Sequence, residues 1–193
     1  MIIETALEEY PKELKLKDGS ACQVRPLTSA DEKPFHEFFL AVPESERMFI
    51  KHRVVDPQVI KEWCQNIDYG RNLPLLALIG DKIIASTTLH QQYGGWKRHI
   101  GRVSILVHPG FRGRGLARAL VMELIELARQ TGLEKIEAEF IAEQEAAIKM
   151  FGLLGFHLLV KIPDYVKDMQ TISHDYVLMG LDLDTDEEFA GMG

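Results

Sequence analysis

The hydrophobic pattern is most regular over residues 114–132, where apolar side chains recur at the spacing of an amphipathic helix. The apolar face is formed by Leu116, Leu120, Leu124 and Leu127. Gly132 follows, and glycine commonly ends a helix. We therefore predict a long helix here with one buried face.

Three further helices are predicted from their start and stop signals. Thr28 or Ser29 precedes acidic residues and an apolar pattern that ends before Pro43, and Asp56-Pro57 opens a second such segment. Ser, Thr and Asp side chains accept hydrogen bonds from the first amides of a helix, and proline suits its first position. Helices are expected within residues 28–42, 56–67 and 143–155.

Strand signals fill much of the remaining chain. Asp18-Gly19 and Gly80-Asp81 stand between segments rich in β-forming residues, which predicts two hairpins. Other strands are expected within residues 99–109, 133–142, 156–162 and 173–183. This order of elements predicts an α+β fold. Because the chain has no repeat and no break in composition, we expect a single domain over residues 1–182 with an acidic, flexible tail over 183–193.

Composition narrows the classes of function. The 193 residues carry a net charge of −7, which argues against nucleic acid as the main partner. No apolar run approaches the ~20 residues of a membrane span, and the acidic N-terminal segment lacks the apolar core of a secretion signal. The two cysteines, Cys22 and Cys64, have neither metal-binding nor disulfide spacing. We therefore expect a cytoplasmic protein with no metal and no membrane partner.

Charge is distributed unevenly along the chain. No Asp or Glu occurs between Lys82 and Met122, although seven Lys and Arg residues do. Such a bias either marks a polyanion site or is a chance fluctuation on a solvated surface. Three of the cations, Arg112, Arg114 and Arg118, gather at the start of the predicted long helix. Their position favours a polyanion site.

The segment HPGFRGRGLARAL, residues 108–120, joins a strand to that helix. A glycine-rich turn leaves backbone amides unpaired at the helix N-terminus, where the helix dipole also favours an anion. Gly113 and Gly115 let a bulky group approach the backbone, and Gly115 can adopt dihedral angles that other residues resist. The segment predicts a phosphate or pyrophosphate site. It lacks the Gly-Lys-Ser/Thr of nucleotide loops, and Arg118 stands where the dinucleotide fingerprint needs glycine or alanine.

Two short motifs carry a family resemblance. Arg112, Gly115 and Ala117 form the pattern Arg-x-x-Gly-x-Ala, and Gly155-Phe156 follows the predicted short helix. With the order of elements between residues 22 and 182, they resemble the GNAT superfamily of acyl-CoA N-acyltransferases. The resemblance implies a layered α/β/α fold whose twisted, mostly antiparallel mixed sheet is splayed in the middle. It also implies acetyl-CoA as the co-substrate, bound in the cleft.

The same resemblance implies roles for particular residues. The strand before the loop would pair with the pantetheine arm, and one of its N–H groups, assigned to Leu106, would hold the thioester oxygen. The pyrophosphate would lie on the loop amides and arginines. The predicted cofactor-binding residues are Ile105, Leu106, Val107, Arg112, Gly113, Arg114, Gly115, Leu116, Ala117, Arg118, Gln144 and Phe151.

Three residues depart from the family pattern. Gln144 stands where an asparagine usually bonds the pantetheine, and Phe151 stands where a tyrosine often protonates the leaving thiolate. Arg102 replaces the glutamate base that protein-lysine members commonly carry, and arginine cannot be a base at pH 7. Because a thiolate leaves tolerably well without an acid, the missing tyrosine slows the reaction rather than forbidding it.

Other residues are candidates for proton transfer. Glu139, His90 and His157 are candidate bases, and Tyr165 is a candidate acid from a neighbouring loop. Each also has an ordinary structural interpretation, such as Glu139 facing solvent, His90 in a loop and Tyr165 in the core. The predicted catalytic residues are Leu106, Glu139 and Tyr165.

The favoured function is transfer of an acetyl group from acetyl-CoA to a primary amine by direct attack in a ternary complex. The amine belongs to a small molecule or a protein, since residues 24–47 are loosely similar to bacterial protein-lysine acetyltransferases. Residues 35–63, whose aromatics equally suit a helix core, and residues 162–179 are expected to wall the acceptor pocket. The second segment also offers a contact for a homodimer. The alternative is a CoA-binding sensor without turnover, which Phe151 and Arg102 favour.

Overall fold

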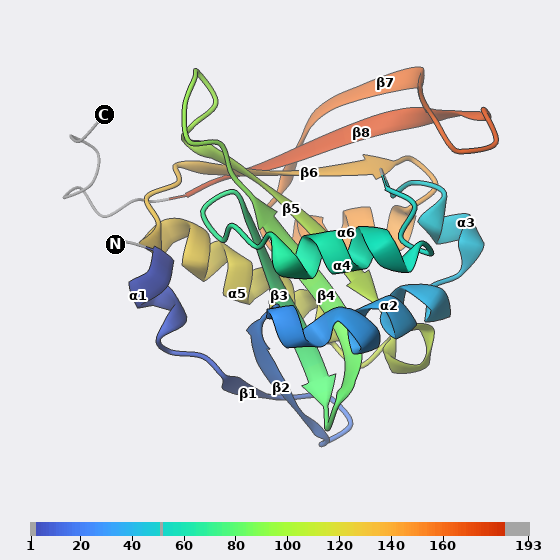
Figure 1. The fold of residues 1–193 in the computed structure, drawn as a ribbon. Helices are drawn as coiled ribbons and strands as arrows, with labels where there is room; N and C mark the ends of the chain where they lie inside the picture. Colours follow the sequence, from blue (N-terminus) through green and yellow to red (C-terminus); the bar gives the residue numbers. More distant parts are fainter. Residues whose placement is uncertain (1–2, 51, 184–193) are drawn as a thin grey trace.

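A computed structural model describes residues 3–50 and 52–183, in which eight strands form one twisted sheet (Figure 1). The order is β1-β2-β3-β4-β5-β6-β8-β7, and only the β5–β6 pair is parallel. The strands are β1 (Lys12–Lys15), β2 (Ala21–Pro26), β3 (Asn72–Ile79), β4 (Lys82–His90), β5 (Ile100–Val107), β6 (Lys135–Ile141), β7 (His157–Lys167) and β8 (Ser173–Asp182). The predicted α+β fold with a mostly antiparallel sheet is confirmed.

Helices cover both faces of this sheet, which confirms the layered α/β/α arrangement (Figure 1). One face carries α1 (Ile3–Leu7), α5 (Leu116–Gln130) and α6 (Glu145–Leu153), and the other carries α2 (Glu32–Ala41) and α4 (Pro57–Gln65). The short α3 (Glu44–Arg47) and 3-10 turns at Ser29–Asp31 and Pro109–Phe111 lie in the connections.

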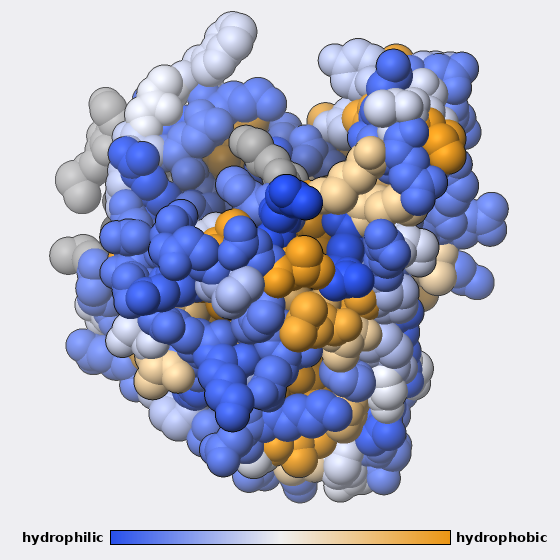
Figure 2. Space-filling view, turned by 45° about the vertical axis from the view of Figure 1, so that its right-hand side comes forward, coloured by the Kyte–Doolittle hydropathy of each residue, from blue (hydrophilic) through white to orange (hydrophobic). Residues whose placement is uncertain are grey.

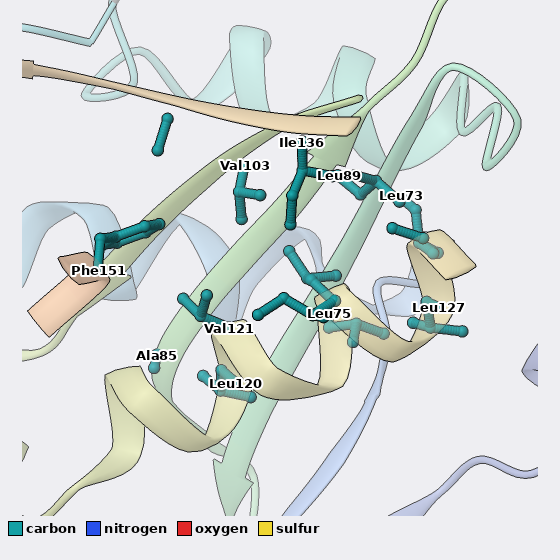
Figure 3. Packing of buried hydrophobic residues seen from close by; sticks show 14 of the residues in the cluster. Leu73, Leu75, Ala85, Leu89, Val103, Leu120, Val121, Leu127, Ile136 and Phe151 are labelled. Carbon is teal, nitrogen blue, oxygen red and sulfur yellow. The ribbon is translucent and has the colours of Figure 1, made fainter. Parts of the chain in front are cut away.

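The predicted long helix forms for the reason its sequence suggests. All four leucines of its apolar face are buried, and they pack on the central strands. Figure 3 shows Leu120, Val121 and Leu127 of α5 against Leu75 and Ala85 of the sheet. At the predicted start of α4, the Asp56 side chain accepts a hydrogen bond from the Gln58 amide at 2.9 Å. Capping and apolar periodicity therefore fix both helices.

A second apolar layer lies under α2 and α4. It contains Phe35, Phe38 and Phe39, whose side chains are at most 4% exposed. The aromatic residues of α2 are therefore core residues and not a wall of the acceptor pocket.

The sequence pattern missed three features. The helices α1 and α3 are too short to show an apolar period, and β7 continues past residue 162 to Lys167. Pro163 and Asp164, which disfavour strands, lie where the β7–β8 register shifts between Ile162 and Val166.

The predicted tail also begins too early, because Leu183 is 6% exposed and its amide donates to the Glu134 carbonyl at 2.8 Å. The rest of that predicted tail, 184–193, lies outside the described residues.

The sheet opens between β5 and β6, as the predicted splay requires. Their pairing is limited to Ile100–Arg102 of β5 with Lys135–Glu137 of β6, and the strands part from Val103 onward. The ladder between β4 and β5 continues to Val107, and that between β6 and β8 continues to Ile141. Facing edges of β5 and β6 are therefore left without ladder partners in the region that we call the split.

Candidate active site

The open edge of β5 presents alternate backbone amides to the split. The His108 amide donates to the Ile84 carbonyl at 2.9 Å, and the register runs unshifted from there to Arg102. Hydrogen-bonded and non-hydrogen-bonded pairs alternate in such an antiparallel ladder. The backbone N–H and C=O groups of the even-numbered β5 residues therefore point toward β4. The amides of Ile105 and Val107 therefore face the split, where an extended ligand can pair with them.

Leu106 faces the other way, which corrects its assignment as the oxyanion donor. Its backbone pairs with Ser86 of β4, and its side chain packs against the apolar layer under α2 and α4. Among the three predicted strand residues, only Ile105 and Val107 have amides that reach the split. The Val107 carbonyl already accepts hydrogen bonds from Arg112 Nε and Nη2, each at 3.2 Å.

Two glycines shape the loop between β5 and α5. Gly113, with φ of 76°, and Gly115, with φ of 80°, both adopt the left-handed conformation, and Gly115 caps the N-terminus of α5. Throughout residues 3–50 and 52–183, no acceptor is recorded for the amides of residues 113–118. These consecutive donors at the start of a 15-residue helix suit a diphosphate.

Arg112 and Arg114 of the loop and Arg118 of the first turn of α5 differ in what they contact. Arg112 donates to Glu46 of α3 at 2.9 Å, and Arg114 donates to Asp18 of the β1–β2 turn at 2.8 Å. Arg118 is exposed and has no ion-pair partner among the described residues. The segment without Asp or Glu, residues 82–122, therefore forms ion pairs with acidic residues from other parts of the fold. Of Arg112, Arg114 and Arg118, Arg118 alone lacks an ion pair within residues 3–50 and 52–183.

Gln144 and Phe151 lie beyond β6 and differ in their exposure. The exposed Gln144 accepts a hydrogen bond from the Ile141 amide at 3.0 Å, at the far end of the split. Phe151 is 1% exposed and packs edge-on against Phe140 and Phe156, with ring centroids 5.0 and 4.9 Å away. The predicted cofactor contact of Phe151 is therefore corrected, because its ring belongs to the core.

An ionic cluster occupies the closed end of the split. Arg102 Nη1 donates to Glu139 Oε2 at 3.0 Å, and the Tyr176 hydroxyl of β8 donates to Glu139 Oε1 at 3.0 Å. Both carboxylate oxygens of the predicted base Glu139 are thus engaged. Burial and the Glu139 charge raise the pKa of Tyr176, so its hydroxyl stays protonated.

A second polar cluster lies on the β5 side of the same opening. His90 Nδ1 is 2.7 Å from Asn72 Oδ1, and His90 Nε2 is 3.2 Å from Ser104 Oγ. Burial and then the Arg102 charge lower the pKa of His90 to about 4, so the ring is neutral at pH 7. His90 therefore belongs to a structured cluster in β4 and not to a loop.

The strand register brings the two clusters face to face. Arg102 pairs with Glu137, so two residues further along each strand Ser104 and Glu139 stand on opposite sides of the split. Sequence reasoning missed Asn72, Ser104 and Tyr176. Ser104 could have been found from its alternation with Arg102 on one strand face, whereas Asn72 and Tyr176 come from strands remote in sequence.

The remaining predicted residues, Tyr165 and His157, lie on the edge strand β7. Tyr165 is a strand residue, 64% exposed, and its ring centroid is 5.6 Å from that of Tyr176. It is therefore neither a loop residue nor a core aromatic. His157 pairs with Gly180 of β8, and two strands, β6 and β8, separate it from β5. Apolar side chains exposed on β7 include Leu158 and Leu159, and Figure 2 shows apolar patches on the face turned forward.

A pocket of about 280 Å³ opens beside the closed end of the split. Its lining includes Asn72, His90, Lys97, Arg102 and Glu139. In the described part of the chain, His, Cys, Asp and Glu form no group of three or more that suits a metal ion. Nor is any helix there long and apolar enough to cross a membrane.

Residues 32–156 match the family model described as the acetyltransferase (GNAT) family. The chain belongs to the GNAT family. The split between β5 and β6 and the glycine loop both lie within the matched residues.

Curated relatives of this GNAT protein include bacterial acetyltransferases. It is 29% identical over 96 residues to an L-methionine sulfoximine/L-methionine sulfone acetyltransferase of Salmonella typhimurium, covering 45% of this chain and 56% of that protein. It is 31% identical over 81 residues to the L-amino acid N-acyltransferase MnaT of Escherichia coli, covering 39% and 47%. The matches span about half the length of these two relatives.

Solved structures share the whole GNAT fold. The GNAT domain of S. lividans PAT superposes with a TM-score of 0.72 at 24% identity, covering 91% of this chain and all of that one. A putative acetyltransferase, yncA of Salmonella typhimurium with its cofactor acetyl-CoA, superposes with a TM-score of 0.72 at 21% identity, covering 86% and 96%. At these identities the likeness establishes the fold.

Proposed function

We propose that this protein transfers an acetyl group from acetyl-CoA to a primary amine by direct attack in a ternary complex. The observation that carries the proposal is the continuity of two binding elements. The split-facing amides of Ile105 and Val107 lead directly into the unpartnered amides of residues 113–118. A pantetheine arm extended along the first would place its diphosphate on the second.

The thioester then lies at the closed end of the split. The amine attacks the carbonyl carbon, the C–N bond forms, and the C–S bond breaks to release the thiolate, which takes up a proton. The Val103 amide belongs to the last β5–β6 bridge, between Arg102 and Glu137, so the Ile105 amide is the first one left for a ligand beyond the closed end. We assign the oxyanion contact to Ile105 in place of Leu106, because a donor there stabilises charge that develops only in the transition state.

We assign the acceptor to small molecules that carry both an amine and a carboxylate. Side chains of both signs line or adjoin the pocket, in the pairs Arg102–Glu139 at 3.0 Å and Lys97–Glu137 at 3.8 Å. Cations beside carboxylates suit a zwitterion. The names of two curated relatives, which act on L-amino acids or L-methionine derivatives, support the same class of acceptor.

Thermal shift with CoA, followed by free-thiol release from acetyl-CoA, tests this function. The amine panel contains L-amino acids, L-methionine sulfone, their carboxamides and a lysine peptide. We expect stabilisation by CoA and thiol release with the free amino acids well above that with the carboxamides. Release with the peptide alone would overturn the acceptor assignment. Thermal stabilisation by CoA with no thiol release on any amine would contradict catalytic turnover and favour the CoA-binding sensor.

A further inference from the structure

Three strands contribute to one hydrogen-bonded chain beside the split. Asn72 comes from β3, His90 from β4 and Ser104 from β5, the strand with the open edge. We propose that Ser104 and His90 carry the proton of the attacking amine, with Asn72 positioning the imidazole. The proposal rests on the proposed function and supplies its proton path.

The atoms in contact determine which group donates in each hydrogen bond of this network. A carboxamide oxygen only accepts hydrogen bonds, so the 2.7 Å contact with Asn72 Oδ1 places the proton of neutral His90 on Nδ1. Nε2 then presents its lone pair to the Ser104 hydroxyl at 3.2 Å. Ser104 is exposed and forms the outer end of the hydrogen-bonded network, and the partly buried His90 lies behind it. His90 and Asn72 line the acceptor pocket, whereas the exposed Ser104 adjoins Ile105, so we place the attacking nitrogen at the Ser104 hydroxyl.

The carboxylates on the opposite side are less suited to receive the proton. Glu139 accepts from Arg102 and from Tyr176, one on each oxygen, and Glu137 pairs with Lys97 at 3.8 Å. Taking up the amine proton on Glu139 would disrupt the Arg102 ion pair or the Tyr176 hydrogen bond. The Ser104–His90 pair has an acceptor, Nε2, whose only recorded partner within the described chain is the hydroxyl itself.

The electrostatics of His90 suit a relay in both directions. Burial and the Arg102 charge lower the pKa of His90 to about 4, against the opposing effect of Glu139. The ring is therefore neutral and ready to accept at pH 7. Such a base is too weak to deprotonate an alkylammonium with a pKa of ~10.4, so the amine must arrive neutral. The relay acts after the C–N bond has formed, when the nitrogen is cationic and far more acidic.

The step is balanced as follows. The amine lone pair attacks the thioester carbon, and the carbonyl π electrons move to the oxygen. The cationic nitrogen gives a proton to Ser104 Oγ as the Ser104 hydroxyl proton moves to His90 Nε2. The oxyanion collapses and the C–S bond breaks with its electrons on sulfur. The imidazolium returns the proton through Ser104 to the thiolate, whose conjugate acid has a pKa near ~8.5. The same pair thus replaces the tyrosine acid that Phe151 cannot provide.

Nitrogen-15 NMR of the imidazole rings tests the hydrogen-bonded chain in the protein alone. Wild-type His90 is expected to be neutral at pH 7, with its proton on Nδ1 and Nε2 accepting. Ser104→Ala should move the Nε2 resonance of His90, whereas Ser86→Ala, a matched hydroxyl loss on β4, should not. An Nε2-protonated ring or an imidazolium at pH 7 would overturn the relay whatever the enzyme kinetics show.

Kinetics with acetyl-CoA and the best amine of the panel test the proton path. We expect His90→Gln and Ser104→Ala to lower kcat by about 10²-fold or more, with little change in the Kd for CoA. Ser104→Thr, which keeps the hydroxyl, should retain most of the activity. Asn72→Ala should lower kcat and raise the share of the wrong tautomer.

The outcomes separate the two proposals. Active wild type with fully active His90→Gln and Ser104→Ala would overturn the relay and leave the proposed function standing. Wild type inactive on every amine would overturn the proposed function, and the relay with it. An acetylated Ser104 found by peptide mapping after incubation with acetyl-CoA alone would replace the relay with a covalent mechanism.

Discussion

Arg102 of β5 and Glu139 of β6 form an ion pair, with Nη1 and Oε2 3.0 Å apart, across the point where the two strands separate. Arg102 is also the last β5 residue in register with β6. Its charge therefore acts on both sides of the split. It engages one carboxylate oxygen of Glu139 and lowers the pKa of His90.

Removing the Arg102 charge should raise the pKa of His90. In Arg102→Gln only burial still disfavours the imidazolium, so the midpoint rises from about 4 but stays below the ordinary value of ~6.5. NMR titration of the His90 ring measures it. Arg98→Gln, on the exposed β4–β5 loop, is the matched control. An unchanged midpoint in Arg102→Gln would show that Arg102 does not act on His90.

The lowered pKa of His90 also determines the direction in which the free energy of unfolding changes with pH. The folded-state pKa of His90 lies below its unfolded value, so the unfolded chain takes up a proton first as the pH falls. Stability is therefore lost between about pH 6.5 and pH 4, and His90→Gln should flatten this part of the curve of unfolding free energy against pH.

Gly115→Ala should weaken CoA binding, and Gly132→Ala should not. Both glycines have φ of 80°, at opposite ends of α5, so each substitution costs about 1–2 kcal/mol of stability. Only a Cβ at Gly115 projects into the crowded loop, 3.1 Å from Lys17 Cε. Calorimetry should give a Kd for CoA at least about tenfold higher for Gly115→Ala. Equal Kd values for the two variants would remove the diphosphate from the loop.

Arg118→Gln should weaken CoA binding in a salt-dependent way. Arg118, in the first turn of α5, has no ion pair among the described residues, so its charge is available to phosphates. At low salt we expect about a threefold or larger rise in the Kd for CoA, shrinking near 1 M salt, and no change for pantetheine. Arg129→Gln, at the other end of α5 and paired with Glu126, serves as the control. A pantetheine affinity that falls equally would contradict the phosphate contact.

Restoring the family's hydroxyl with Phe151→Tyr should destabilise the protein without raising kcat. The ring is 1% exposed between Phe140 and Phe156, so a hydroxyl there is buried among aromatic carbons. Burying it without a partner costs about 1–3 kcal/mol. Chemical denaturation and kcat on the folded fraction measure both effects, with the exposed Phe49→Tyr for comparison. A rise in kcat would mean that position 151 reaches the thiolate.

His174 should stabilise the fold more in mild acid than in base. Its Nδ1 is 3.0 Å from Glu143 and its Nε2 is 3.1 Å from Asp168, and these hydrogen bonds raise the pKa of His174. The contribution is complete below the unfolded pKa of ~6.5 and is lost as the pH rises through the folded one. The loss of Tm in His174→Gln should therefore be larger at pH ~6 than at pH ~9. His157→Gln, on the exposed β7, is the control, and a pH-independent loss would exclude the ion pairs.

Local signals predicted most of the fold because their causes are local. Asp56 caps α4 within two residues, and the leucines of α5 are spaced along one helix. The loop could also be predicted from the sequence, because Gly113 and Gly115 adopt positive φ values that favour glycine.

The chemistry at the closed end could not be predicted, because it depends on strand neighbours. Glu139 was expected to act as a base, but its partners Arg102 and Tyr176 lie 37 residues away in either direction. His90 was one of several candidates until the fold placed Asn72 and Ser104 on its two nitrogens. The Leu106 assignment failed because strand parity depends on a register that no single segment encodes.

The β1–β2 turn holds the glycine loop from outside the residues that define the family. The Lys17 amide donates to the Arg114 carbonyl at 3.1 Å, and Asp18 accepts from the Arg114 side chain. The family match begins only at residue 32. A chain shortened to the matched segment would keep both sequence motifs yet leave the loop without its N-terminal brace. The geometry of this loop therefore depends on residues that the family match does not include, and we expect substitutions at Lys17 or Asp18 to alter it.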